Sequence, residues 1–126
     1  MQKIFLTLVA VLLLVGCSAS EKSYETIEIT TIESKVSDGW QIVDVREIEE
    51  YNGGHIPNAL NVPLTSISKG EYASLEQDQN YIIICQSGNR SQTASEQLTK
   101  AGFQVLNVKQ GMSSWTGDII TEEQSR

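Results

Sequence analysis

Basic residues are scarce in this chain of 126 residues. It contains 9 Lys and Arg against 16 Asp and Glu, which gives a formal net charge of −7. A protein this acidic is not expected to bind nucleic acid or to be attracted electrostatically to anionic lipid. Long apolar runs are lacking as well. The stretch Ile4 to Val15 is almost continuously apolar, but a helix needs roughly 20 such residues to span a bilayer.

Cysteine is also scarce, with only Cys17 and Cys85 in the sequence. A basic start, a short apolar region and a small residue at its end are typical of a secretory signal. The sequence LVGC at 14–17 resembles a bacterial lipobox, which implies cleavage before Cys17 and attachment of a diacylglyceryl group to its sulfur. The two acyl chains of that group would hold the protein on a membrane. The alternative is an ordinary signal peptide with an incidental cysteine.

The leader divides the chain into unequal parts. We predict a lipoprotein signal peptide at 1–17 that ends at the lipobox cysteine, a tether at 18–23, one folded domain at 24–117 and a C-terminal tail at 118–126. Lipidation of Cys17 would leave Cys85 as the one free thiol, so no intramolecular disulfide could form. We therefore expect an extracytoplasmic protein, lipid-anchored to a bacterial membrane on its periplasmic or cell-surface side. A lone thiol is exposed to oxidation there, which favours a chemical role for it.

Short strands and helices alternate along the predicted domain. We expect strands at 24–29, 41–45, 59–62, 81–85 and 104–108, and helices at 31–36, 47–51, 91–101 and 111–115. A weaker helical segment is expected within 64–80, best around 71–75. Thr30 and Glu33 fit a capping box at the start of the first helix, and the end of the tail, 121–126, is expected to fray. Strands and helices in this alternation, joined by short turns, predict an α/β fold with a small parallel β-sheet flanked by helices on both faces.

The stretch Tyr81 to Arg90, YIIICQSGNR, carries the strongest functional signal. Its apolar run is typical of a buried parallel strand, and an amphipathic helix pattern begins right behind it. Cys85 should therefore lie at the carboxyl end of a strand and face the amino end of a helix, where open α/β sheets bind ligands. Backbone N–H groups and the helix dipole would there favour a thiolate over a thiol.

The residues that follow Cys85 suit a cradle for an anion. Gly88 permits a tight turn, and Arg90 adds a positive charge that would help to hold an anion and to lower the pKa of the cysteine. The alternative is a buried structural cysteine, a common fate of free cysteines. It is disfavoured because such a residue would not be expected to lead directly into SGNRS.

Several motifs together resemble the rhodanese-like sulfurtransferases. They are DVRE at 44–47, EY at 50–51, GHIPNALNVP at 54–63, CQSGNRS at 85–91 and QGM with a tryptophan at 110–115. The resemblance extends over about residues 24–117. Two departures are visible, since Asn58 stands where glycine is usual and Gln110 replaces one of two paired glycines. Asparagine tolerates a left-handed backbone better than most residues, so we expect the fold to be undisturbed.

The resemblance implies a rhodanese-type chemistry centred on Cys85. Its thiolate takes a sulfane sulfur from a donor such as thiosulfate and becomes a persulfide, which then passes the sulfur to a thiol or cyanide-like acceptor. The transferred sulfur would be held by loop N–H groups, from Gln86, Ser87, Gly88, Asn89 and Arg90. No metal or organic cofactor is implied. The implied partners are a small sulfur-containing donor and an acceptor, which could be a protein.

Two other functions remain open. Rhodanese-like domains also serve as binding or sulfur-carrier modules without turnover, and a carrier would share the persulfide step. A Cdc25-like phosphatase or arsenate reductase has a related loop, but with five residues between cysteine and arginine, where this chain has four. The shorter loop fits one sulfur atom better than a tetrahedral oxyanion.

The remaining polar candidates are expected to be structural. His55 lies in a GHIP turn, and a cysteine whose pKa is already lowered by its loop needs no general base. Asp44 and Arg46 lie at the end of a strand and are expected to form a buried or rim ion pair, with a position of Arg46 near the pocket mouth as the alternative. The acidic run EIEEY at 47–51 is predicted to be a solvated helix face.

Overall fold

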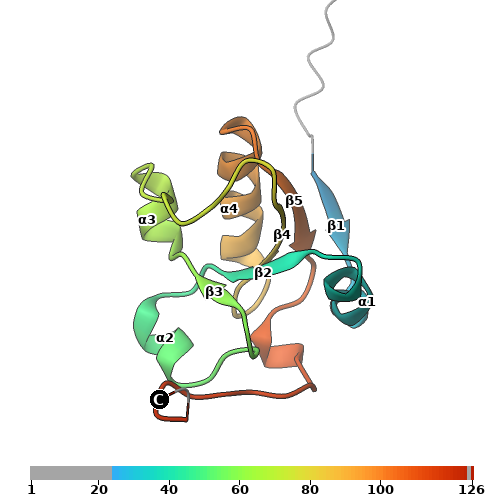
Figure 1. Ribbon diagram of the computed structural model, residues 1–126, viewed down its shortest axis with the longest axis vertical. Helices are drawn as coiled ribbons and strands as arrows, with labels where there is room; N and C mark the ends of the chain where they lie inside the picture. The colour runs from blue at the N-terminus through green and yellow to red at the C-terminus, as the bar shows by residue number, and fades with distance from the viewer. Residues whose placement is uncertain (1–23, 125) are drawn as a thin grey trace, which may run out of the picture.

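A parallel β-sheet organises the part of the chain that the computed structural model describes, residues 24–124 and 126 (Figure 1). Its strands are β1 (Glu25–Ile27), β2 (Gln41–Asp44), β3 (Leu60–Asn61), β4 (Asn80–Ile84) and β5 (Gln104–Val108). Their spatial order is β1-β5-β4-β2-β3, and every neighbouring pair is parallel. The predicted signal peptide, Cys17 and the tether lie outside the described residues.

Helices cover both faces of this sheet. They are α1 (Ile32–Ser37), α2 (Ile48–Asn52), α3 (Leu64–Ser68) and α4 (Asn89–Lys100), with 3₁₀ turns η1 (Ile29–Thr31) and η2 (Met112–Ser114). One core cluster contains Ile67 of α3 and Leu98 of α4, and the other contains Ile32 of α1 and Met112 of η2. The predicted α/β fold, with helices on both faces of a parallel sheet, is confirmed. No helix within the described residues is long and apolar enough to cross a membrane.

Strand β4 is the centre of both cores. Tyr81 and Ile83 belong to one cluster and Ile82 and Ile84 to the other, and each is at most 2% exposed. Alternate side chains of a strand point to opposite faces, so a strand covered on both faces needs apolar residues at every position. This explains the continuous run that leads into Cys85.

The helix expected within 64–80 is confirmed, but it lies at Leu64–Ser68 and not around 71–75, where the pattern favours it most. Pro63 precedes its first turn, and Ile67 is 3% exposed in the same core cluster as Leu98 of the adjacent helix α4. Residues 71–75 form a loop with a turn at 73–74. The helix therefore forms where an apolar side chain can be buried against α4.

The capping box predicted for Thr30 and Glu33 is wrong. Thr31 is the N-cap of α1, and it makes no side-chain capping hydrogen bond. The box occurs instead at α2, where Glu47 and Glu50 cap each other's backbone N–H groups. The Glu47 N–H donates to Oε1 of Glu50 at 3.3 Å, so a residue of the predicted solvated face supports the helix start.

The two departures from the rhodanese-like pattern fit the fold. Asn58 has φ of 68° and is the one non-glycine residue with positive φ in the described part of the chain. The side chain of Gln110 accepts a hydrogen bond from the N–H of Ile29 at 2.9 Å and so ties the end of β5 to η1.

The start of the C-terminal segment is paired with the domain. The N–H of His55 donates to the carbonyl of Ile120 at 3.0 Å, and the reverse bond is 2.9 Å. Glu122 then donates its N–H to the carbonyl of Asn52. Residues 120–122 therefore lie against the turn that follows α2, although the sequence predicts a frayed end from 121.

Candidate active site

Cys85 lies between the end of β4 and the start of α4, as the sequence predicts. It is 1% exposed, and it is the one free cysteine of the described residues. The backbone N–H of Gly88, the N-cap of α4, donates a hydrogen bond to its sulfur at 3.1 Å. The sulfur thus lies at the carboxyl edge of the sheet, where ligands bind in open α/β folds.

Burial and hydrogen-bond donors act on the pKa of Cys85 in opposite directions. Burial is the largest influence on the thiol and raises its pKa, but the hydroxyl of Ser91 and the backbone N–H groups of Ser91, Gly88 and Ser87 lower it. The balance leaves the pKa below the ordinary value of 9.0. Donors that stabilise the charged form favour the nucleophilic thiolate.

Ser91 is the site residue that sequence reasoning misses. It is fully buried in the first turn of α4, its hydroxyl donates a hydrogen bond to the carbonyl of Val108 at 3.5 Å, and the residue lowers the pKa of Cys85. A serine near a helix start is ordinarily interpreted as a capping residue, so its residue type gives no sign of a thiolate partner. The signal would have been its position six residues after the cysteine, one turn into the helix.

Two glycines permit the close packing of the loop. Gly88 has φ of 93°, and a Cβ there would lie 2.2 Å from the carbonyl oxygen of Lys109. A Cβ on Gly111 would lie 2.1 Å from the carbonyl of Gln86. No larger residue fits at either position without moving the backbone, which fixes the loop around the sulfur.

Residues of the turn η2 form hydrogen bonds to the backbone of the Cys85 loop. The N–H of Met112 donates to the carbonyl of Cys85 at 2.8 Å, and the N–H of Ser113 donates to the carbonyl of Gln86 at 3.1 Å. The hydroxyl of Ser113 donates to the same Gln86 carbonyl at 3.0 Å. These carbonyls are therefore held away from the sulfur by a separate segment of the chain.

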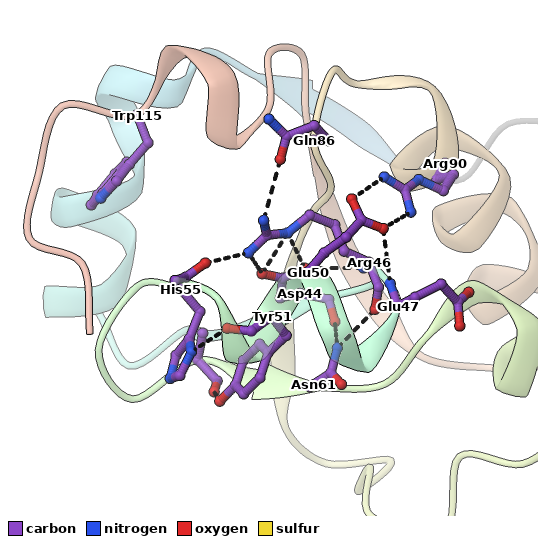
Figure 2. Close-up of polar contacts among 12 residues, drawn as sticks. Asp44, Arg46, Glu47, Glu50, Tyr51, His55, Asn61, Gln86, Arg90 and Trp115 are labelled. Carbon is purple, nitrogen blue, oxygen red and sulfur yellow. Dashed lines mark hydrogen bonds and ion pairs between the residues drawn. The ribbon is translucent and has the colours of Figure 1, made fainter. Parts of the chain in front are cut away.

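Arg90, predicted to help bind substrate, is turned toward α2. Its two terminal nitrogens bind the carboxylate oxygens of Glu50 at 2.6 Å and 2.9 Å (Figure 2). The pair lowers the pKa of Glu50 and raises that of Arg90. Arg90 is not among the principal causes that lower the pKa of Cys85, which come from Ser91 and backbone N–H groups. The run at 47–51 is therefore more than a solvated face.

The side chain of Gln86 binds Arg46, and Asn89 is exposed. Oε1 of Gln86 accepts a hydrogen bond from Nη1 of Arg46 at 3.2 Å (Figure 2). Asn89 is the first residue of α4. Of the predicted loop, Gly88 donates its N–H to the sulfur, and the N–H of Ser87 also lowers the pKa of Cys85. A substrate role for Gln86, Asn89 and Arg90 stays a prediction.

The predicted ion pair between Asp44 and Arg46 is confirmed. Nη2 of Arg46 lies 2.7 Å from Oδ2 of Asp44, and the two side chains are 6% and 1% exposed. Nε of Arg46 adds further bonds to the same carboxylate, and Nη2 also donates to the carbonyl of Gly54 at 2.7 Å. Arg46 thus joins the end of β2 to the turn after α2 and to the loop residue Gln86.

A cavity of about 400 Å³ lies beside the loop. It is lined by Arg46, Glu49, Glu50, Gly53, Gly54, Gln86, Met112 and Ile119. Two glutamates and one arginine therefore give this cavity an acidic rim. Among the described residues, no group of His, Cys, Asp and Glu could hold a metal ion.

His55 occupies the structural position that the sequence predicts. Its ring stacks on that of Tyr51 with centroids 3.6 Å apart, and Nδ1 lies 2.8 Å from the carbonyl oxygen of Tyr51. The residue is 5% exposed. Its contacts thus hold the turn after α2 against the helix.

The sequence is similar to those of known proteins. The sequence profile described as "Rhodanese-like domain" matches residues 29–118. YrkF of Bacillus subtilis, provisionally named a sulfur carrier protein, is 41% identical over 103 residues, which are 79% of this chain and 55% of YrkF. The chain thus spans about half the length of that relative. YtwF of the same organism, provisionally named a sulfurtransferase, is 38% identical over 61% of this chain and 74% of YtwF.

Solved structures agree with the sequence matches. A rhodanese-related protein from Thermoplasma volcanium superimposes with a TM-score of 0.72 at 30% identity, covering 79% of this chain and all of that protein. A rhodanese-like domain protein from Staphylococcus aureus gives a TM-score of 0.69 at 32% identity and covers 78% of this chain and 98% of its own. The chain therefore belongs to the rhodanese-like family.

Proposed function

We propose that the protein is a sulfurtransferase that moves a sulfane sulfur from a donor such as thiosulfate to a thiophilic acceptor through a persulfide on Cys85. One observation carries the proposal, namely the hydrogen bond at 3.1 Å from the N–H of Gly88, at the start of α4, to the buried sulfur of Cys85, whose pKa is lowered by Ser91 and the backbone N–H groups of the loop. Donors placed in this way stabilise negative charge both on the thiolate and on a sulfur attached to it. Similarity to YtwF, with its sulfurtransferase name, supports the same reaction.

The reaction proceeds in two half-reactions. The Cys85 thiolate attacks the outer sulfur of thiosulfate, a new S–S bond forms, and the electron pair of the broken S–S bond leaves on sulfite. The persulfide is then attacked at its outer sulfur by cyanide or a thiolate. The Cys85–sulfur bond breaks, and its electron pair restores the thiolate. This is ping-pong covalent catalysis in which no cofactor takes part.

A sulfur-carrier role is the second candidate. It is favoured by similarity to YrkF, and by the burial of Cys85, which would protect a persulfide from solvent. A carrier shares the first half-reaction and differs in handing the sulfur to one partner protein. A phosphatase is disfavoured, because four residues separate Cys85 from Arg90 and the Arg90 guanidinium is held by Glu50.

Steady-state kinetics test the proposal. With thiosulfate and cyanide, parallel double-reciprocal plots are expected for the wild type, and Cys85→Ser should abolish transfer. High turnover would support the enzyme, and slow turnover with a stable persulfide would support the carrier. Full activity of Cys85→Ser would show that the assignment of Cys85 is wrong, and lack of any persulfide would favour a binding module.

We also propose that the chain is lipid-anchored through Cys17 on the outer side of a bacterial membrane. The lipobox resemblance at 14–17 supports this localisation. Cell fractionation of the wild type and of Cys17→Ala tests it. The wild type should sediment with membranes and incorporate labelled fatty acid, and the variant should do neither. An unlabelled wild-type protein would contradict the anchor.

A further inference from the structure

Both arginines near the Cys85 loop are already compensated by carboxylates. Arg46 is bound by Asp44, and Arg90 is bound by Glu50. The cavity beside the loop adds Glu49 next to Glu50. Counted over these five side chains, the surroundings of the loop carry a net negative charge before any substrate arrives. Two arginines that could attract an anionic donor thus lie near the loop, but each is already bound to a carboxylate.

The Glu50–Arg90 pair is the adjustable one. The two side chains come from α2 and α4, 40 residues apart, and are 37% and 34% exposed, so the pair can open without exposing core. Arg90 occupies the first turn of α4, directly behind the loop. The hydrogen bonds of Arg90 to Glu50 raise the pKa of Arg90, and the charge on Cys85 raises it further. The guanidinium therefore lies within electrostatic reach of the sulfur.

We propose that Glu50 is a specificity-determining residue, which holds the charge of Arg90 away from the donor and so favours donors of low negative charge over dianionic thiosulfate. The proposal rests on the sulfurtransferase function proposed above. Glu50 touches neither the sulfur nor the donor in this account. It acts through the position of Arg90.

The charges of the two donor classes explain the expected discrimination. Attack on thiosulfate brings two negative charges to the thiolate, and three remain in the products, the persulfide and sulfite. With a hydropersulfide of a neutral thiol, the outer sulfur passes to Cys85. The electron pair leaves on the donor thiol's sulfur, which takes the proton that the outer sulfur carried. One negative charge is present throughout, so repulsion from the acidic rim matters far less.

Single-turnover loading of Cys85 tests this inference. The rate constants for sulfur transfer from thiosulfate and from mercaptoethanol hydropersulfide are measured by intact mass spectrometry at low salt. In Glu50→Gln the thiosulfate rate constant should rise on the order of tenfold, or about 1.4 kcal/mol, with little change for the hydropersulfide. Glutamine at this capping-box position retains the helix start. Added salt should reduce the difference.

Matched variants separate the effect of releasing Arg90 from the effect of removing one negative charge from the cavity rim. Glu49→Gln removes the same charge from the same cavity without releasing Arg90, so its gain with thiosulfate should be much smaller. In Glu50→Gln combined with Arg90→Met, the gain should vanish. An equal gain in Glu49→Gln, or an unchanged donor ratio in Glu50→Gln, would overturn the inference and leave the function standing. If neither donor loads the wild type, the proposed function itself fails.

Discussion

Two arginine–carboxylate pairs flank the Cys85 loop, and they differ in burial. Asp44 and Arg46 are 1% and 6% exposed, whereas Glu50 and Arg90 are 37% and 34% exposed. The chemistry of the two pairs is the same, and their shortest distances are 2.7 Å and 2.6 Å. Burial therefore decides what each pair contributes.

The buried pair is part of the framework of the site. Removing one partner of such a pair leaves an uncompensated charge without water, which is strongly destabilising. The half-exposed pair can exchange its contacts for water at little cost. A site built from both can keep its fold while the outer pair sets which donor it accepts.

The largest effect is expected for Asp44→Asn. The variant keeps the shape of the side chain but leaves Arg46 buried without its counter-charge, so unfolding free energy should fall by about 3–5 kcal/mol. Chemical denaturation measures it. The exposed Asp78→Asn makes the same chemical change and should leave the stability near that of the wild type. Equal stability of Asp44→Asn and the wild type would show that burial does not distinguish the two pairs.

Gly88→Ala is expected to damage the loop that both pairs surround. Positive φ alone costs an alanine about 1–2 kcal/mol, and its Cβ would also lie 2.2 Å from the carbonyl oxygen of Lys109. Gly70→Ala is the matched control, since Gly70 has φ of 74° and open space around it. Gly88→Ala should lose more stability than Gly70→Ala and most of its sulfur loading. Equal losses would mean that the close packing of the loop is unimportant.

Ser91→Ala tests whether the residues around Cys85, and not the two arginine–carboxylate pairs, lower the pKa of the thiol. Loss of the hydroxyl donor should raise the pKa of Cys85, because the thiolate loses a stabilising partner. The rate of alkylation by iodoacetamide rises with pH through that pKa. The variant's profile should therefore shift to higher pH, with a rate on the order of tenfold lower on the acidic limb.

The control for this shift is Ser95→Ala, on the same helix. Ser95 is also fully buried, and its hydroxyl has no hydrogen-bond partner in the described structure. Its pH profile should coincide with that of the wild type. If Glu50→Gln shifted the profile as far as Ser91→Ala, the arginine pair would control the thiol after all.

The smallest effect is expected for the stability of Glu50→Gln. The pair is solvent-screened, so the loss should be less than about 1 kcal/mol. Arg90 lowers the pKa of Glu50, so the stabilisation is present above the unfolded carboxyl's ordinary value of 4.5 and is lost as pH falls through the folded pKa. Denaturation of the two proteins should differ at neutral pH and converge once the pH falls below the lowered, folded pKa of Glu50. A constant difference would contradict an ionic origin.

Regular features of the site could be predicted from the sequence because they depend on neighbouring residues. The apolar run before Cys85 and the helix pattern behind it place the thiol, and β4 and α4 lie within two residues of the expected bounds. Asn58 adopts the left-handed backbone that its type tolerates. These are local properties of residue type and spacing.

Long-range partners could not be predicted in this way. Glu50 meets Arg90 across 40 residues, and its acidic neighbours made a solvated face the simpler interpretation. The influence of Ser91 on the pKa of Cys85 depends on the fold of the loop and α4 in three dimensions, which residue type does not encode. Helix α3 lies at the start of the expected segment 64–80 and not around 71–75, because tertiary burial of Ile67 against α4 outweighs the weak local preference there.

The most direct test of the central claim is intact mass spectrometry of the protein after incubation with a sulfur donor. The wild type should gain the mass of one sulfur atom, localised to Cys85 by peptide mapping, and lose it on addition of cyanide. Cys85→Ser should gain nothing. A wild-type protein that never gains the sulfur, or a Cys85→Ser variant that does, would contradict the account.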